Sequence, residues 1–123
     1  MINDVKKRNI RRCRRSMRVR KQVRGTGERP RLSVFKSNAH ICAQLIDDDR
    51  GCTLASAGTI TKEFRNRNLN KKCKEAARLI GIKIAEAAKQ MNITGAVFDR
   101  GYNKYHGVLA EIANGARETG LQF

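Results

Sequence analysis

Arginine and lysine crowd the start of this 123-residue chain at a density that suits a polyanion. Thirteen of the first 31 residues are Lys or Arg, opposed only by Asp4 and Glu28. Such a stretch has too few apolar residues to offset its backbone entropy and self-repulsion, so it requires a polyanionic partner. Clustered guanidinium groups make forked contacts with phosphates and stack on exposed bases, which favours RNA. The candidate phosphate contacts are Lys7, Arg8, Arg11, Arg12, Arg14, Arg15, Arg18, Arg20, Lys21 and Arg24.

A second set of polar and aromatic residues follows this arm. Residues 40–46 alternate, so Ile41, Ala43 and Leu45 share one face of a strand and the side chains between them share the other. If helices cover the apolar face, the remaining side chains lie on an open face, where they suit RNA sugars and loop bases. An ordinary half-buried strand position is the alternative for the aromatic residue of this set. The candidate RNA contacts here are Arg29, Arg31, Ser33, Phe35, Lys36, Ser37, Asn38, His40 and Gln44.

A third set lies in the loop 99–107, which follows a short apolar run at 95–98. The end of a strand is a common position for ligand contacts in open sheets. For Tyr105, a role as a lid on the core is the alternative. The candidate RNA contacts of this loop are Arg100, Lys104, Tyr105 and His106.

Four aspartates raise the alternative of a two-metal nuclease: Asp47, Asp48, Asp49 and Asp99. Successive residues of an extended strand point to opposite faces, so the triplet cannot converge on one pair of ions. We therefore interpret residues 47–51 as a turn and expect no metal site, no cofactor and no enzymatic activity. The cysteines at 13, 42, 52 and 73 form no CxxC pair, which predicts reduced, structural thiols rather than a zinc site.

Periodicity predicts the elements that must position these residues. Strands are expected over 32–36, 40–46 and 52–57 as an antiparallel meander, with a shorter buried strand over 95–98. An amphipathic helix is expected over about 70–91, with Asn70 as N-cap and Asn92 as stop, and a second over about 108–119, ended by Gly120. The predicted fold class is α/β in the two-layer α+β sense: a mixed sheet of about four strands, order βββ-α-β-α, with the helices on one face.

The chain divides into a basic RNA-binding arm and linker (1–28) and a globular α/β RNA-binding domain (29–123). Arginines share helical faces in the arm, so we expect it to become a helix once phosphates neutralise it, with residues 25–30 breaking that helix. No run approaches the length of a membrane span, and the start lacks the apolar segment of a secretory signal. A mitochondrial presequence is the alternative for the arm, disfavoured by its charge density. We expect a cytoplasmic protein with no membrane partner and no small-molecule substrate.

Seven segments in order carry a resemblance that covers nearly the whole chain: RPRLSVFKSN (29–38), HI (40–41), AQLIDD (43–48), TLAS (53–56), FDRG (98–101), YHG (105–107) and ARETGLQF (116–123). Together they resemble the family of bacterial large-subunit (50S) ribosomal protein eighteen. The chain departs from the family pattern at Tyr102-Asn103, where the aromatic residue is shifted by one position, and at Val108, where the family often has arginine.

The resemblance implies a ribosomal protein that binds 5S rRNA and helps attach it to 23S rRNA in the central protuberance of the large subunit. Ribosomal protein five and other proteins of the protuberance are the implied protein partners, and the implied fold is the α/β fold shared with small-subunit protein eleven. A nuclease would instead show divalent-metal-dependent cleavage, and a free-standing RNA chaperone would show no preference for 5S rRNA over tRNA. Sequence-specific DNA binding is disfavoured because no recognition helix with a dimer interface is apparent.

Overall fold

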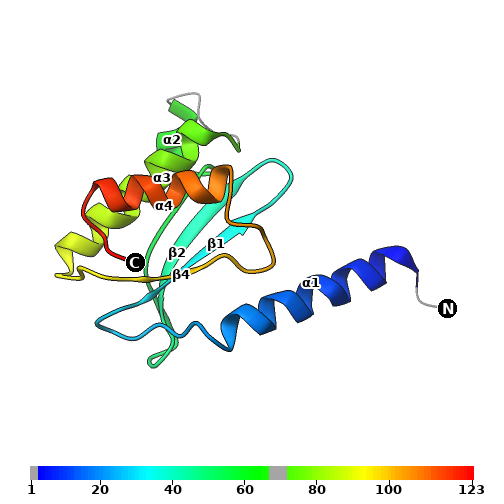
Figure 1. Ribbon diagram of the computed structural model, residues 1–123. Coiled ribbons are helices and arrows are strands. Elements are labelled where there is room, and N and C mark those ends of the chain that lie inside the picture. The colour runs from blue at the N-terminus through cyan, green and yellow to red at the C-terminus, as the bar shows by residue number, and fades with distance from the viewer. Residues whose placement is uncertain (1–2, 67–71) are drawn as a thin grey trace.

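The body of the chain is built on one four-stranded sheet (Figure 1). In the computed structural model, which describes residues 3–66 and 72–123, the strands are β1 (Arg31–Lys36), β2 (Ile41–Asp47), β3 (Cys52–Gly58) and β4 (Val97–Asp99). Their order is β3-β2-β1-β4, with antiparallel pairing of β1 with β2 and of β2 with β3, and parallel pairing of β1 with β4. The predicted meander and the predicted fold class are confirmed.

Two helices, α3 (Lys74–Gln90) and α4 (Val108–Glu118), cover one face of this sheet. The predicted alternation decides which face, because Ile41, Ala43 and Leu45 are fully buried in the core shared with the helices. Gln44, between them in the chain, is exposed on the opposite face. The core therefore lies on the helical side, and the other side of the sheet is open to a partner.

The two helices approach each other at glycines. A Cβ atom on Gly81 of α3 would lie 2.1 Å from the carbonyl oxygen of Ile112, and one on Gly115 of α4 would lie 2.4 Å from that of Arg78. Both distances are far below van der Waals contact, so only glycine allows this separation of the helices. Along α3, Ala85 and Ala88 are buried in the core, while Met91, the C-cap residue, is 38% exposed.

The ends of the helices agree with the expected stop signals. Asn92 has a φ of 59°, the left-handed conformation that ends α3, and Gly120 has a φ of 110° after α4. Asn70, the expected N-cap of α3, lies outside the described residues. The described helix has Cys73 as its N-cap, and the Cys73 Sγ accepts a hydrogen bond from the Ala76 amide at 3.4 Å.

Two local features differ from the prediction. A short helix, α2 (Lys62–Asn66), was not expected, because one apolar residue in five gives no periodicity. Its Phe64 is 2% exposed and closes one end of the core. The strand expected over 95–98 is instead β4 at 97–99, since Ala96 donates its amide to the Gln122 carbonyl at 2.8 Å and so pairs with the C-terminal segment.

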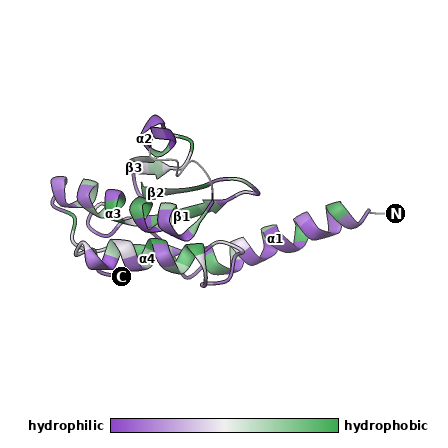
Figure 2. Ribbon diagram, turned by 90° about the horizontal axis from the view of Figure 1, so that it is seen from above, coloured by the Kyte–Doolittle hydropathy of each residue, from purple (hydrophilic) through white to green (hydrophobic). Residues whose placement is uncertain are grey.

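The arm forms a helix, α1 (Asp4–Arg20), that projects from the body and is largely hydrophilic (Figures 1 and 2). None of its residues is buried, so local effects support it. Asn3 caps it by accepting the Lys6 amide at 2.9 Å, while Asp4 and Arg20 have the charges that favour the two ends of a helix dipole. The helix ends at Arg20, before the predicted breaker at 25–30. The expectation that the arm becomes a helix only once phosphates neutralise it considered burial and left out this local support.

Candidate nucleic-acid interface

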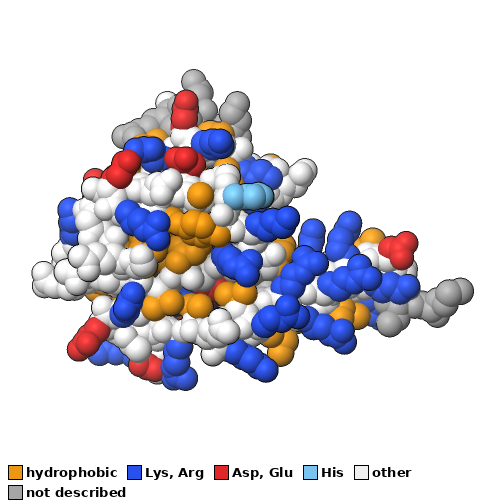
Figure 3. Space-filling model, viewed as in Figure 1, with side chains coloured by type: hydrophobic (Ala, Val, Ile, Leu, Met, Phe, Trp, Pro, Cys, Tyr) orange, Lys and Arg blue, Asp and Glu red, His pale blue; other side chains and the backbone are white. Residues whose placement is uncertain are grey.

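The cations of α1 form an unneutralised array on the outside of the molecule (Figure 3). The helix contains nine Lys or Arg residues and one acidic residue, Asp4 at its far end. Within the described part of the chain, none of the nine pairs with a carboxylate, and all are exposed. Like charges four residues apart, such as Arg11 and Arg15, oppose the helix by a few tenths of a kcal/mol per pair. Phosphates placed along this surface would remove that opposition.

The second half of α1 lies against the loop that follows β4. The Arg12 guanidinium carbon lies 5.1 Å from the centre of the Tyr102 ring, a cation–π contact. One turn further on, the Ser16 hydroxyl lies next to Gly101. These contacts bring the arm and the 99–107 loop, two predicted RNA-binding segments distant in sequence, to the same side of the molecule.

The open face of the sheet presents a polar row and one exposed aromatic ring. Ser33, Gln44 and Ser56 face one another across three strands, through the register pairs Ser33–Gln44 and Gln44–Ser56. Phe35 is 62% exposed at the end of β1, with Cys42 as its partner on β2. Of the two alternatives for Phe35, the structure places it on the open face rather than in the core.

The turn between β1 and β2 uses two predicted contact residues for its own structure. The Ser37 hydroxyl accepts the His40 amide and donates to the His40 carbonyl, both at 3.0 Å. The His40 ring is half-buried, with its Nδ1 2.9 Å from the Thr59 Oγ1. Lys36 at the start of this turn is half-buried, and Asn38 within it is exposed.

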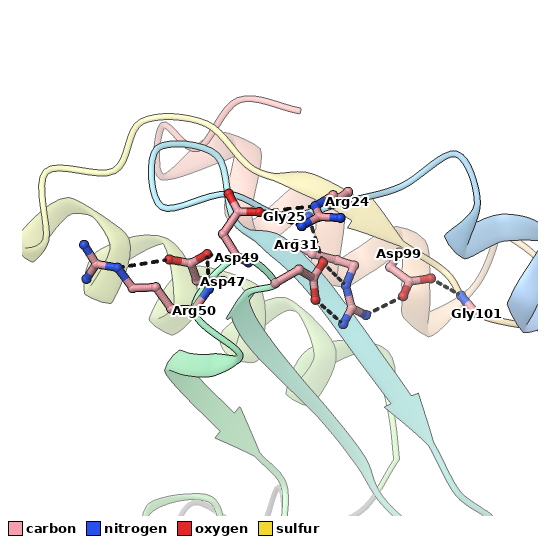
Figure 4. A network of polar contacts seen from close by, with 9 residues as sticks. Arg24, Gly25, Arg31, Asp47, Asp49, Arg50, Asp99 and Gly101 are labelled. Atoms are coloured by element: carbon pink, nitrogen blue, oxygen red, sulfur yellow. Dashed lines mark hydrogen bonds and ion pairs between the residues drawn. The ribbon is translucent and has the colours of Figure 1, made fainter.

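All four aspartates form ion pairs with arginines beside a tight turn (Figure 4). Asp48 holds Arg31 through two hydrogen bonds, at 3.0 and 3.1 Å, and Asp99 holds the same guanidinium at 2.7 Å. Asp49 pairs with Arg24 at 2.8 Å. Asp48 also accepts the Gly25 amide at 2.8 Å, which anchors the linker to the body.

This network buries Arg31, which the sequence analysis placed on the RNA-binding surface. Arg31, predicted to contact RNA, is 5% exposed and its guanidinium is occupied by two carboxylates. The hydrogen bonds from Arg31 lower the pKa of the Asp48 carboxyl from its usual value. Asp47 pairs with Arg50 at 3.8 Å and also caps the turn by accepting the amides of Asp49 and Arg50. Among the described residues no cluster of three His, Cys, Asp or Glu side chains could hold a metal ion. The predicted turn is present over residues 48–51, and Asp47 is the last residue of β2.

The loop after β4 exposes its predicted contacts. Arg100, Lys104 and His106 are exposed, and the Arg100 guanidinium donates to the Asn103 carbonyl at 2.9 Å. Tyr105 is 44% exposed, which leaves it accessible to a partner, and its ring also packs edge-on against Phe98 at 5.3 Å, as a lid on the core would. Its hydroxyl accepts a hydrogen bond from Arg117.

One hollow is lined by Arg12 of the arm, by Phe35, Lys36 and Asn38, and by Tyr102 and Asn103 of the loop, whereas Arg31 is buried. Arg29 lies apart, donating to the Ala96 carbonyl at 3.4 Å. Sequence reasoning missed Tyr102 and Asn103, which line the junction between arm and loop. An aromatic residue directly after a glycine in a basic loop was the available signal for Tyr102. Ser56 was missed because its place beside Gln44 depends on strand register.

These features define a class of protein: a small α/β body with an exposed cationic helix and an open polar sheet face, built to bind a nucleic-acid backbone. No described helix is both long enough and apolar enough to cross a membrane.

Comparison with known proteins narrows this class. The family model described as ribosomal L18 of archaea, bacteria, mitochondria and chloroplasts matches residues 6–123. The chain is 57% identical to the large ribosomal subunit protein uL18 of Protochlamydia amoebophila, 50% to that of Chlamydia felis and 48% to that of Chlamydia trachomatis serovar D, in each case over 123 residues and all of both chains. The chain belongs to the ribosomal L18 family and is a ribosomal protein of the large subunit, so the predicted family and the predicted ribosomal location are confirmed.

Proposed function

We propose that this chain binds 5S rRNA and helps attach it to 23S rRNA in the central protuberance of the large subunit. The observation that carries the proposal is the row of exposed cations on α1, none of which pairs with a carboxylate among the described residues. Net charge on the whole protein is +16, and only a polyanion neutralises it efficiently. Ribosomal protein five and other proteins of the protuberance are the proposed neighbours.

The two parts of the chain are proposed to do different work. The arm and linker, residues 1–28, supply affinity through phosphate contacts that carry no sequence information. The body, residues 29–123, supplies shape selectivity through the open sheet face and the loop after β4. Within the body the proposed contacts are the exposed or half-buried members of the predicted set: Arg29, Ser33, Phe35, Lys36, Ser37, Asn38, His40, Gln44, Arg100, Lys104, Tyr105 and His106.

The role is proposed to be structural rather than catalytic. The aspartates that raised the nuclease alternative are each paired with Arg24, Arg31 or Arg50, and the two that converge, Asp48 and Asp99, do so on the Arg31 guanidinium, which occupies the place a metal ion would need. A surface of this kind orients folded RNA without reacting with it.

A pull-down of RNA tests this proposal. The tagged full-length chain is mixed with 5S rRNA, 23S rRNA, 16S rRNA and tRNA, and the bound RNA is sized on a gel. We expect enrichment of 5S rRNA over tRNA at 150 mM salt, followed by 23S rRNA recruitment through the 5S complex. Equal recovery of 5S rRNA and tRNA would point to a free-standing chaperone. Cleavage that requires a divalent metal would point to a nuclease.

A further inference from the structure

We propose that a hollow between α1, the end of β1 and the loop after β4 holds one unstacked nucleotide of the bound RNA, with its base stacked on Phe35. This inference rests on the proposed function, because it names the part of the RNA that this surface takes. The hollow has a volume of about 470 Å³, within the ~300–1,000 Å³ of small-ligand sites. Its walls come from three elements: Arg12 of α1, Phe35, Lys36 and Asn38 of β1 and its turn, and Tyr102 and Asn103 of the loop.

Phe35 offers a platform that the protein itself does not cover. Its ring is 62% exposed, although Val34 beside it in the strand is buried in the core. The register partner of Phe35 on the open face is Cys42, whose side chain is too small to cover an aromatic ring. Base stacking on such a platform tolerates any base, because every base has a π-face.

The charges around the platform favour a nucleotide over an apolar ligand. Arg12 and Lys36 line the hollow, and it contains no acidic residue. An adjoining hollow of about 210 Å³ shares Phe35 and includes Asp99, whose carboxylate is already paired with Arg31. The larger hollow of about 660 Å³ elsewhere on the body is lined by Glu28, Asp47 and Asp49, which would repel a phosphate. The flanking phosphates of a stacked base would therefore meet cations here.

The remaining walls are arranged to contact a base edge. The side-chain amides of Asn38 and Asn103 have no hydrogen-bond partner among the described residues, so each offers both a donor and an acceptor. Arg100 holds the backbone of Asn103 through its carbonyl at 2.9 Å, and Arg12 holds Tyr102 by the cation–π contact. The loop side of the hollow is thus held by Arg100 from outside the lining and by Arg12 from within it.

Affinity for two RNA probes tests the proposal with the full-length protein. One probe is a 15-nucleotide single strand with 2-aminopurine at its centre, whose fluorescence falls when it stacks on an aromatic ring. The other is the same strand in a duplex. We expect Phe35→Ala to weaken binding of the single strand by about 5- to 150-fold, equivalent to ~1–3 kcal/mol for one stacked base, and to abolish the quenching. Binding of the duplex should change less than twofold, with an unchanged salt dependence.

Two further variants make the result specific. Phe35→Tyr keeps the stacking surface and should keep the single-strand affinity. Ile60→Ala removes an equally exposed apolar side chain, 60% exposed and outside the hollow, and should change neither probe. Equal weakening of both probes by Phe35→Ala would show that Phe35 only shapes the surface. Unchanged binding of both probes would show that Phe35 does not contact RNA and that the hollow takes another partner, such as a protein. Either result overturns the proposal. Neither result bears on the preference for 5S rRNA, which the pull-down decides separately.

Discussion

Removal of the α1 helix should weaken RNA binding and reduce its salt dependence, because phosphate contacts are lost, while the body stays folded. The deletion is of residues 1–20, which ends where the helix ends and keeps both the Arg24–Asp49 pair and the Gly25 contact with Asp48. Because no residue of α1 is buried, the deletion removes no part of the core. The urea midpoint of the body should therefore equal that of the full chain.

The size of the effect follows from the geometry of the helix. Its 17 residues span roughly 25 Å, and the nine cations are distributed around its circumference, so about half of them can face one RNA surface at a time. Each phosphate contact contributes about 0.7–0.9 to the slope of log affinity against log salt, which predicts that the slope flattens by about 4. Between 50 and 200 mM salt the full chain should then lose on the order of 100-fold more affinity than the truncated chain.

Fluorescence anisotropy with labelled 5S rRNA at five salt concentrations measures both slopes. A matched control keeps the length of the arm and replaces all its helical cations by glutamine: Lys6, Lys7, Arg8, Arg11, Arg12, Arg14, Arg15, Arg18 and Arg20. This variant should flatten the slope as much as the deletion does, since glutamine keeps the helix and removes only charge. An unchanged slope in the truncated chain, or a truncated chain that no longer folds, would refute the reasoning.

Three other predictions concern ion pairing, helix packing and thiol chemistry. Asp48→Asn should lower the free energy of unfolding by about 2–3 kcal/mol in urea titrations, slightly less than the loss of a fully buried pair, because the Asp48 side chain is 21% exposed. Asp49→Asn, which breaks an exposed pair, should leave the urea midpoint unchanged. Arg31 lowers the pKa of the Asp48 carboxyl, so this stabilisation is complete above about pH 4 and is lost as the pH falls through the lowered pKa. The free energy of unfolding of the Asp48→Asn chain should therefore fall less steeply with decreasing pH than that of the unmodified chain. Gly81→Ala should destabilise by ~2 kcal/mol or more, although alanine is the better helix former, and stabilisation would show that α3 and α4 can separate at no cost. All four thiols should titrate in denaturant without prior reduction, and in the native protein exposed Cys52 should react before Cys42, whose pKa is raised by burial; recovery of two thiols or none would contradict this.

The sequence was a good guide wherever neighbouring residues suffice to decide the structure. Charge density in the first 31 residues predicted an exposed cationic arm, which the structure has as α1, and strict alternation at 40–46 identified the buried face of β2. The positive-φ stop at Asn92 was equally readable, because asparagine tolerates a left-handed backbone. Each of these properties depends on local geometry and needs no knowledge of distant contacts.

Features that depend on partners far along the chain were not readable. Arg31 resembled every other arginine of the basic segment, and only the fold brings it to Asp48 and Asp99, which convert an apparent RNA contact into a buried structural pair. The helix α2 was missed because the burial of Phe64 is a tertiary contact without a periodic pattern. The need for glycine at Gly81 and Gly115 likewise follows from the close contact between α3 and α4, which the sequence does not reveal.

The same distinction applies to the site. The sequence by itself determined that this protein carries a dense cationic helix and a polar sheet face, because charge and alternation are properties of contiguous residues. Only the tertiary structure decided that Arg12, Phe35 and Tyr102, separated by up to 90 positions, border one hollow. The physical reason is that stacking and burial act between side chains that are distant in sequence. The fold brings these side chains together only when β4 pairs with β1 at the edge of the sheet.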